Sequence, residues 1–73
     1  MTKKPKHPPL PKYAIGDIVG GKNSDTGNFA IGRVILIEYS LELRDWGYVL
    51  DNPANGLTFV IEEKDIVKEY VKN

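Results

Sequence analysis

Residues 46–61 hold the feature that most constrains this chain, which is a pair of apolar runs joined by a cluster of turn-forming residues. Pro53 has a fixed φ and no amide hydrogen, the Asn and Asp side chains bond their own backbone, and Gly56 accepts positive φ without steric cost. On both sides of the turn apolar residues recur with period two, which is typical of strands with one buried face. The segment is therefore predicted to be a β-hairpin. Its buried face should consist of Trp46, Tyr48, Leu50, Leu57, Phe59 and Ile61.

Two further strands are expected before the hairpin. Gly16-Asp17 signals a tight turn into a short β-branched strand at 18–19. A polar, glycine-rich connecting loop is expected at 20–29. The next strand, 30–39, is apolar on both faces at its centre, as suits a bent strand that serves two faces of a small barrel.

The remaining connections are less clearly signalled. Residues 40–45 lack Gly and Pro, so Leu41 and Leu43 either extend the preceding strand or lie partly exposed on a loop. Residues 62–65 predict a single tight turn of 3-10 type. The spacing in 66–71 fits a short helix or a strand, and we favour a strand because β-branched residues prefer one and because it would close the sheet.

Five short strands with polar turns predict an all-β fold, a small five-stranded SH3-like barrel over residues 13–73. A sandwich would need about seven strands. At 73 residues there is room for one domain. Residues 1–12 hold four of the five prolines and almost no apolar side chains, so they are predicted to form a disordered N-terminal arm.

The charges are unevenly divided although the formal net charge is zero. The arm carries four lysines and no acid, which gives +4, whereas residues 13–73 carry ten acids and six bases, which leaves −4. A polyanion would therefore be attracted by the arm and repelled, on average, by the barrel.

Catalytic chemistry is not expected. The chain has no cysteine, its one histidine, His7, lies in the arm, and no nucleophile and base can be paired, so we predict no enzyme activity and no cofactor. Glu62 and Glu63 are interpreted as solvated turn acids. No metal site is predicted either, because the oxygens around Asp51 are too few for Ca²⁺ and a turn explains them.

The composition also bears on location. No apolar run approaches the ~18 residues of a membrane-spanning helix. The lack of cysteine fits an intracellular protein better than a secreted one, so a cytoplasmic location is expected.

One family resemblance covers residues 13–71. It is carried by four motifs: Ile15-Gly16-Asp17-x-Val19, Gly32-Arg33-Val34-x-x-Ile37, Trp46-x-Tyr48-Val49-Leu50, and Leu57-Thr58-Phe59-Val60-Ile61-x-x-x-Asp65-Ile66-Val67-x-x-Tyr70. This order resembles KOW and Tudor-type SH3-like barrels, and in its layout the RNA-polymerase-interacting module of CarD-type regulators and transcription-repair coupling factors. Thr26-Gly27-Asn28-Phe29 departs from the His-Gly-type turn usual there. The resemblance implies a binding module of the transcription machinery.

We therefore expect a non-catalytic module that contacts another protein, because aromatic residues not needed in the core are typical interface anchors. The candidate residues for protein binding are Tyr13, Phe29, Tyr39, Leu41, Leu43 and Tyr70. For Tyr13 and Tyr70, packing of the chain ends onto the barrel is the competing interpretation. The arm also contains a P-x-x-P sequence, Pro8-Pro9-Leu10-Pro11, of the kind that docks in aromatic grooves.

The alternative function is nucleic-acid binding by the barrel with help from the basic arm. Its candidate residues are Lys3, Lys4, Lys6, Lys12, Arg33 and Arg44. A contiguous basic face lined by aromatic side chains would favour this alternative over protein binding.

Overall fold

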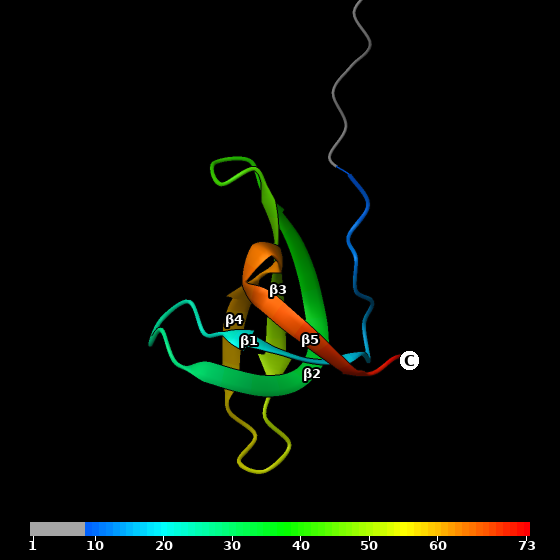
Figure 1. The fold of residues 1–73 in the computed structure, drawn as a ribbon, viewed down its shortest axis with the longest axis vertical. Coiled ribbons are helices and arrows are strands. Elements are labelled where there is room, and N and C mark those ends of the chain that lie inside the picture. The colour runs from blue at the N-terminus through cyan, green and yellow to red at the C-terminus, as the bar shows by residue number, and fades with distance from the viewer. Residues whose placement is uncertain (1–8) are drawn as a thin grey trace, which may run out of the picture.

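The computed structural model describes residues 9–73, which form one antiparallel sheet of five strands (Figure 1). The elements are β1 (Ile18–Lys22), β2 (Phe29–Ser40), β3 (Asp45–Asp51), β4 (Thr58–Glu62), the 3-10 turn η1 (Glu63–Asp65) and β5 (Ile66–Val71). The strand order is β4-β3-β2-β1-β5, so β4 and β5 are the edges of the sheet. The predicted all-β class, the five strands and the tight turn before the last strand are confirmed.

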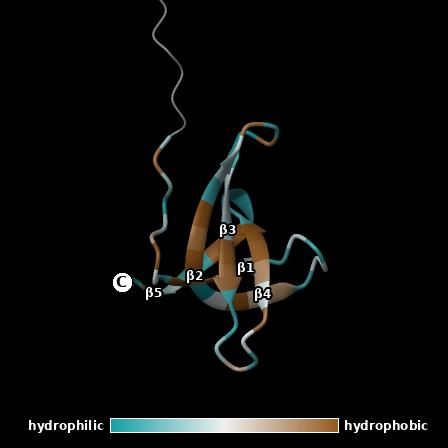
Figure 2. Cartoon of the chain, turned by 180° about the vertical axis from the view of Figure 1, so that it is seen from behind, coloured by the Kyte–Doolittle hydropathy of each residue, from teal (hydrophilic) through white to brown (hydrophobic). Residues whose placement is uncertain are grey.

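The predicted hairpin is formed by β3 and β4 and supplies half of the core. Tyr48 lies opposite Ile61 and Leu50 lies opposite Phe59, and all of these but Phe59 are fully buried. The buried apolar core of the described residues is Val19, Val34, Tyr48, Leu50, Ile61 and Ile66. Figure 2 shows apolar residues along the central parts of β2, β3 and β4.

The two ends of the predicted hairpin face differ from the prediction. Leu57 is 66% exposed, because its amide donates to Asn55 Oδ1 and the residue belongs to the turn rather than to β4. Trp46 is only half-buried and packs against the edge of the core. Period-two alternation is therefore correct for the centre of the hairpin, while the rest of the sheet does not cover its two ends.

The long strand β2 bends between the two halves of the sheet. It pairs with β1 through residues 29–33 and with β3 through residues 33–40, and the β3 register shifts between Val34 and Leu36. Figure 1 shows the curvature that results. The sheet curls so far that Ser24, in the loop after β1, donates its amide to Val60 O of edge strand β4 at 2.9 Å.

The predicted glycine loop at 20–29 is wrong in its first three residues, which belong to β1. Gly20 and Gly21 are buried strand residues, and they pair with Lys68 and Ile66 of the neighbouring antiparallel strand β5. A Cβ on Gly21 would lie 2.2 Å from Asp65 O. These glycines allow close strand approach, and the actual loop is residues 23–28. Among residues 9–73 there is no helix with the length and apolar character needed to cross a bilayer.

Candidate binding surfaces

The part of the arm that the structure describes contacts the sheet. The predicted arm lies partly outside the described residues, since these begin at Pro9, and residues 9–12 have no helix or strand. The Trp46 indole nitrogen donates to Pro9 O at 2.6 Å, and the Lys12 amide donates to Glu63 Oε1 at 2.9 Å. These residues therefore follow a defined path past β3 and η1.

A tyrosine and glutamate pair anchors this path. The hydroxyl of buried Tyr48 donates to Glu63 Oε1 at 2.5 Å and accepts a longer bond from the Tyr13 amide at 3.4 Å. The rings of Tyr13 and Tyr48 meet edge to face, with centroids 5.6 Å apart. Burial and the bond to Glu63 raise the pKa of Tyr48. Glu63 thus accepts hydrogen bonds from both the sheet and the arm, and its interpretation as a solvated turn acid is wrong.

Asp17 joins the two ends of the described chain. It is fully buried, and its carboxylate accepts from the Asn73 amide at 2.7 Å and from the Ala14 amide at 3.0 Å. Burial raises the pKa of Asp17, but the two amide donors, the Glu69 side chain and the nearby Lys72 ammonium together outweigh burial, so the pKa lies below its ordinary value. Asp17, which the sequence suggested only as a turn residue, therefore links the segment before β1 to the segment after β5.

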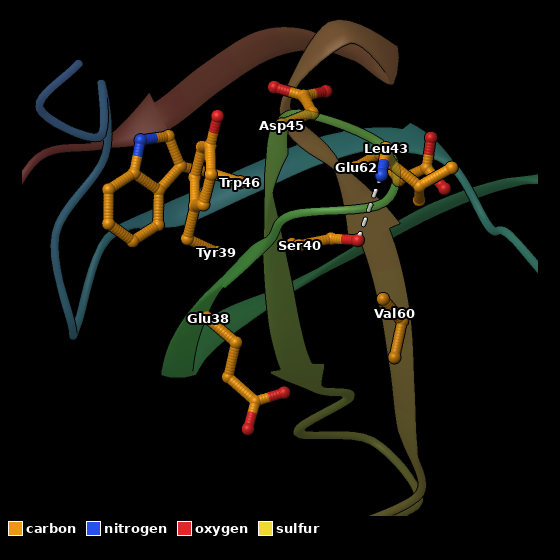
Figure 3. A pocket seen from close by; sticks show the side chains of 9 residues that line it. Glu38, Tyr39, Ser40, Leu43, Asp45, Trp46, Val60 and Glu62 are labelled. Atoms are coloured by element: carbon orange, nitrogen blue, oxygen red, sulfur yellow. Dashed lines mark hydrogen bonds between the residues drawn. The ribbon is translucent and has the colours of Figure 1, made fainter. Parts of the chain in front are cut away.

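A pocket of about 260 Å³ lies at the end of the sheet where β2 turns into β3 (Figure 3). We call it the hairpin pocket, and it is lined by Glu38, Tyr39, Ser40, Leu43, Asp45, Trp46, Gly47, Val60 and Glu62. We call Gly47 its floor, because Gly47 lies on the central strand between Glu38 and Glu62. A Cβ on Gly47 would meet nothing closer than Glu38 O at 3.7 Å. The absence of a side chain at this position leaves the hollow open.

The hairpin pocket is acidic at its rim and apolar inside. Glu38 and Glu62 lie opposite Gly47 on its two neighbouring strands, so both carboxylates flank the floor on one face. Lys64 lies beside this rim, with its ammonium 3.6 Å from Glu62 Oε1 and its amide bonded to Asp45 Oδ2, and Arg44 lies in the chain between Leu43 and Asp45. All three charged residues that line the pocket, Glu38, Asp45 and Glu62, are acids, and they outnumber the two neighbouring cations. Leu43 and Val60 supply apolar contact area.

A second surface, which we call the β1 face, lies on the outer side of β1 with its neighbours β2 and β5. The side chains of Phe29, Ile31 and Tyr70 converge over Gly20, all within 3.2 Å of where a Cβ on Gly20 would lie. Phe29 is 56% exposed, Tyr70 41% and Ile31 40%. Apolar side chains exposed singly are ordinary, but three that meet over one glycine make a surface.

Cations surround the β1 face. Lys22 lies opposite Phe29 across the β1–β2 pair, so both side chains project from the same face. Arg33 is two residues from Ile31 on β2 and shares that face as well. The Lys68 ammonium lies 4.9 Å from the centre of the Tyr70 ring, in cation–π distance. Three of the six cations of residues 13–73 thus border one apolar cluster.

The structure divides the residues predicted for protein binding among three places. Tyr39 and Leu43 line the hairpin pocket, and Tyr39 stacks edge to face with Trp46 at 5.1 Å. Leu41 is 83% exposed at the tip of the same loop. Phe29 and Tyr70 lie together on the β1 face, and Tyr13 packs against Tyr48 of β3.

The residues predicted for nucleic-acid binding are not all brought together. Arg33 borders the β1 face, whereas Arg44 lies in the exposed loop between β2 and β3, with a φ of +54°. Lys12 lies in the described part of the arm, and Lys3, Lys4 and Lys6 lie outside the described residues. The sequence reasoning missed Lys22, Lys68 and Ile31, which strand register and the bulges of β5 place on the β1 face.

The turn at 51–56 is held by hydrogen bonds to its own side chains. Asn52 Oδ1 accepts the Ala54 amide and Asn55 Oδ1 accepts the Leu57 amide, so both amide oxygens serve the turn itself. Within residues 9–73 no group of three or more His, Asp or Glu side chains is placed to hold a metal ion. Asp51 Oδ1 is buried and has no hydrogen-bond partner among these residues.

Comparison of the chain with protein-family models, curated proteins and solved structures gives no match. The resemblance to KOW and Tudor-type barrels therefore rests on the sequence pattern alone.

Proposed function

We propose that this protein is a small SH3-like barrel that acts as a non-catalytic protein-binding module, and that its hairpin pocket binds a basic, extended segment of another protein. The strand order β4-β3-β2-β1-β5, the bend in β2 and the 3-10 turn before β5 support the barrel. The resemblance to polymerase-interacting modules makes RNA polymerase the first whole-protein partner to test. The lack of cysteine supports a cytoplasmic location.

The single observation that carries the proposal is the open floor of the hairpin pocket between two carboxylates. Gly47 leaves space for a ligand side chain, and Glu38 and Glu62 flank that space from the neighbouring strands. An aliphatic side chain fits against Leu43 and Val60, while Lys or Arg residues on either side of it meet the acids. Charge complementarity of this kind sets partner choice and association rate more than affinity alone.

The test is selection of binders from a library of random octapeptides displayed on phage, followed by affinity measurement for the selected peptides. We expect Lys or Arg on both sides of one aliphatic or aromatic residue. Gly47→Val fills the pocket, and Glu38→Gln removes one rim charge without changing shape. Each should weaken binding of the selected peptides, Gly47→Val to below detection and Glu38→Gln by about tenfold.

Glu42→Gln is the matched control, because Glu42 is an exposed acid of the same loop that does not line the pocket. It should leave peptide affinity unchanged. Selected peptides that lack basic residues, or that bind Gly47→Val as tightly as the parent protein, would contradict the proposal.

A further inference from the structure

We propose that the β1 face is a second binding site, separate from the hairpin pocket, and that it takes single-stranded nucleic acid. Single strands are bound by surfaces that combine aromatic rings for base stacking with cations that follow the phosphates. The β1 face presents that combination: two exposed rings, Phe29 and Tyr70, with Lys22, Arg33 and Lys68 around them.

The rings are available because of Gly20. Any larger residue there would push Phe29 Cζ, which would lie 2.8 Å from the added Cβ, and Tyr70 Cε1, which would lie 3.0 Å away. With glycine, both rings lie over the strand backbone with about half of each side chain exposed. Flat π faces held in this way stack on any base, so the site should show little sequence preference.

The charge around the rings favours a polyanion. No acid occurs in β1 or in residues 29–37 of β2, and the one acid of β5, Glu69, lies 3.8 Å from the Lys72 ammonium. Asp51 lies opposite Arg33 on β3, but among residues 9–73 no carboxylate lies within ion-pair distance of Lys22, Arg33 or Lys68. The net −4 of the barrel therefore arises elsewhere, mainly on the hairpin and η1.

The occupant must also be distinguished from an acidic protein surface. An acidic peptide would form ion pairs with the three cations, but its carboxylates would not stack on the exposed rings. A second copy of this chain would bring its acidic hairpin pocket to the β1 face. The basic arm is excluded as an occupant, because its lysines would be repelled by the same cations.

The experiment measures fluorescence anisotropy of labelled dT12 and U12 on the full chain at 50 and 200 mM salt. Replacing Lys22, Arg33 and Lys68 together by Gln should weaken binding at least about tenfold at 50 mM salt. It should also make the slope of log K against log salt about 2 units shallower, since each phosphate contact to a single strand contributes about 0.7. The ratio of the dT12 and U12 affinities shows whether DNA or RNA is preferred.

A second pair of variants separates stacking from general apolar contact. Phe29→Leu keeps an apolar side chain but removes the ring, and should weaken dT12 and U12 binding about 5- to 100-fold. Phe29→Tyr keeps the ring and should restore binding. Thermal unfolding of each variant checks that the fold is intact. Leu41→Ala, which removes an exposed apolar side chain from the loop between β2 and β3, is the control that should leave dT12 and U12 binding unchanged.

The contribution of the arm is measured on the full chain with Lys3, Lys4, Lys6 and Lys12 replaced by Gln. This variant should lose part of the affinity but keep its sensitivity to Phe29→Leu. Three results would overturn the proposal: loss of all binding in the arm variant, equal affinity for a twelve-residue poly-glutamate, and a concentration-dependent dimer that the Lys22, Arg33 and Lys68 substitutions abolish.

Discussion

The two halves of this sheet are packed by different means. In the hairpin half, built from β3, β4 and the second part of β2, large side chains fill the interior, and Tyr48, Leu50 and Ile61 are fully buried. In the other half, β1 and β5 approach so closely that Gly21 lies against the backbone of residues 65 and 66. The hairpin half is held by large buried side chains, whereas the β1 half combines buried Val19 and Ile66 with a close backbone contact that only glycine allows.

The outer surfaces of the two halves differ as well. The hairpin half carries a pocket with an acidic rim, whereas the β1 face gathers three cations around two exposed rings. A formal net charge of zero therefore hides two surfaces that suit opposite kinds of partner. The difference follows from sequence position, because acids are concentrated after residue 37 and β1 contains none.

Gly21→Ala should have the largest effect on stability of the variants that test this difference between the two halves. The added Cβ would lie 2.2 Å from Asp65 O and 2.8 Å from Ile66 Cα, so β5 must move away from β1. We expect a loss of about 3 kcal/mol or more in the free energy of unfolding, which is most of the stability of so small a domain. Urea denaturation followed by tryptophan fluorescence measures the change.

Gly47→Ala is the matched control in the hairpin half. The nearest atoms to its added Cβ would be Glu38 O at 3.7 Å and Val60 Cγ1 at 4.0 Å, which are ordinary contacts. This variant should be as stable as the parent or more stable by about 0.4–1 kcal/mol, because alanine restricts the unfolded chain. Equal midpoints for Gly21→Ala and Gly47→Ala would contradict the division of the sheet into two packing types.

A smaller effect on the β1 half is expected in the pH dependence of its stability. Asp17 supports the β1 half with a carboxylate whose pKa is lowered in the folded state, because two amide donors, the Glu69 side chain and the nearby Lys72 ammonium together outweigh its burial. Its contribution is therefore complete above the unfolded value of about 3.9 and is lost as the pH falls through the folded pKa. Stability of the parent protein should decline below about pH 4, with Asp17 as one contributor.

Asp17→Asn should be less stable at pH 7, by about 1–3 kcal/mol. Each carboxylate oxygen of Asp17 accepts a hydrogen bond from a backbone N–H, and in the variant the side-chain NH2 of Asn would replace one of these acceptors and face that N–H. The stability difference between the variant and the parent should shrink as the pH falls from 5 to 2. Thermal unfolding at several pH values measures it. A difference that stays constant over this range would show that the charge of Asp17 is not what holds the two chain ends.

The hairpin half could be predicted from the sequence because its signals are local. Alternation placed Tyr48, Leu50 and Ile61 inside, and the turn residues placed the reversal between them. The β1 half could not be predicted in this way, because a pair of glycines such as Gly20-Gly21 is as typical of a loop as of two closely paired strands. Only the partner strand, more than 40 residues later in the chain, distinguishes the two.

The candidate surfaces divide in the same way. Tyr39 and Leu43 were identified as binding candidates from sequence, and they line one pocket because they are near each other in the chain. The β1 face was missed as a unit, although Phe29, Tyr70 and Arg33 had each been named. Its members come from three strands, and their meeting depends on cross-strand register and on two bulges in the β1–β5 pair, which have no local signal.

The smallest expected effect concerns the arm, whose described residues, Pro9 to Lys12, contact the hairpin half and η1. Deleting residues 1–11 removes the Pro9 carbonyl that accepts from the Trp46 indole at 2.6 Å, but keeps the Lys12 and Tyr13 amides that bind Glu63 and Tyr48. A single partly exposed hydrogen bond contributes about 0.5–1.5 kcal/mol, so the melting temperature should fall by less than about 8 °C. Differential scanning calorimetry of the two chains measures the shift.

Trp46→Phe separates this bond from any other effect of the arm, because it removes the indole donor and keeps an aromatic ring against the core. In a double-mutant cycle, deleting the arm from Trp46→Phe should cost nothing further, since the bond that the arm makes is already gone. A cost that is the same in both backgrounds would place the contribution of the arm in contacts other than the one to Trp46. A melting temperature that rises on deletion would show that the bound arm strains the hairpin half, and the arm would then be a weak occupant of a surface better suited to another chain.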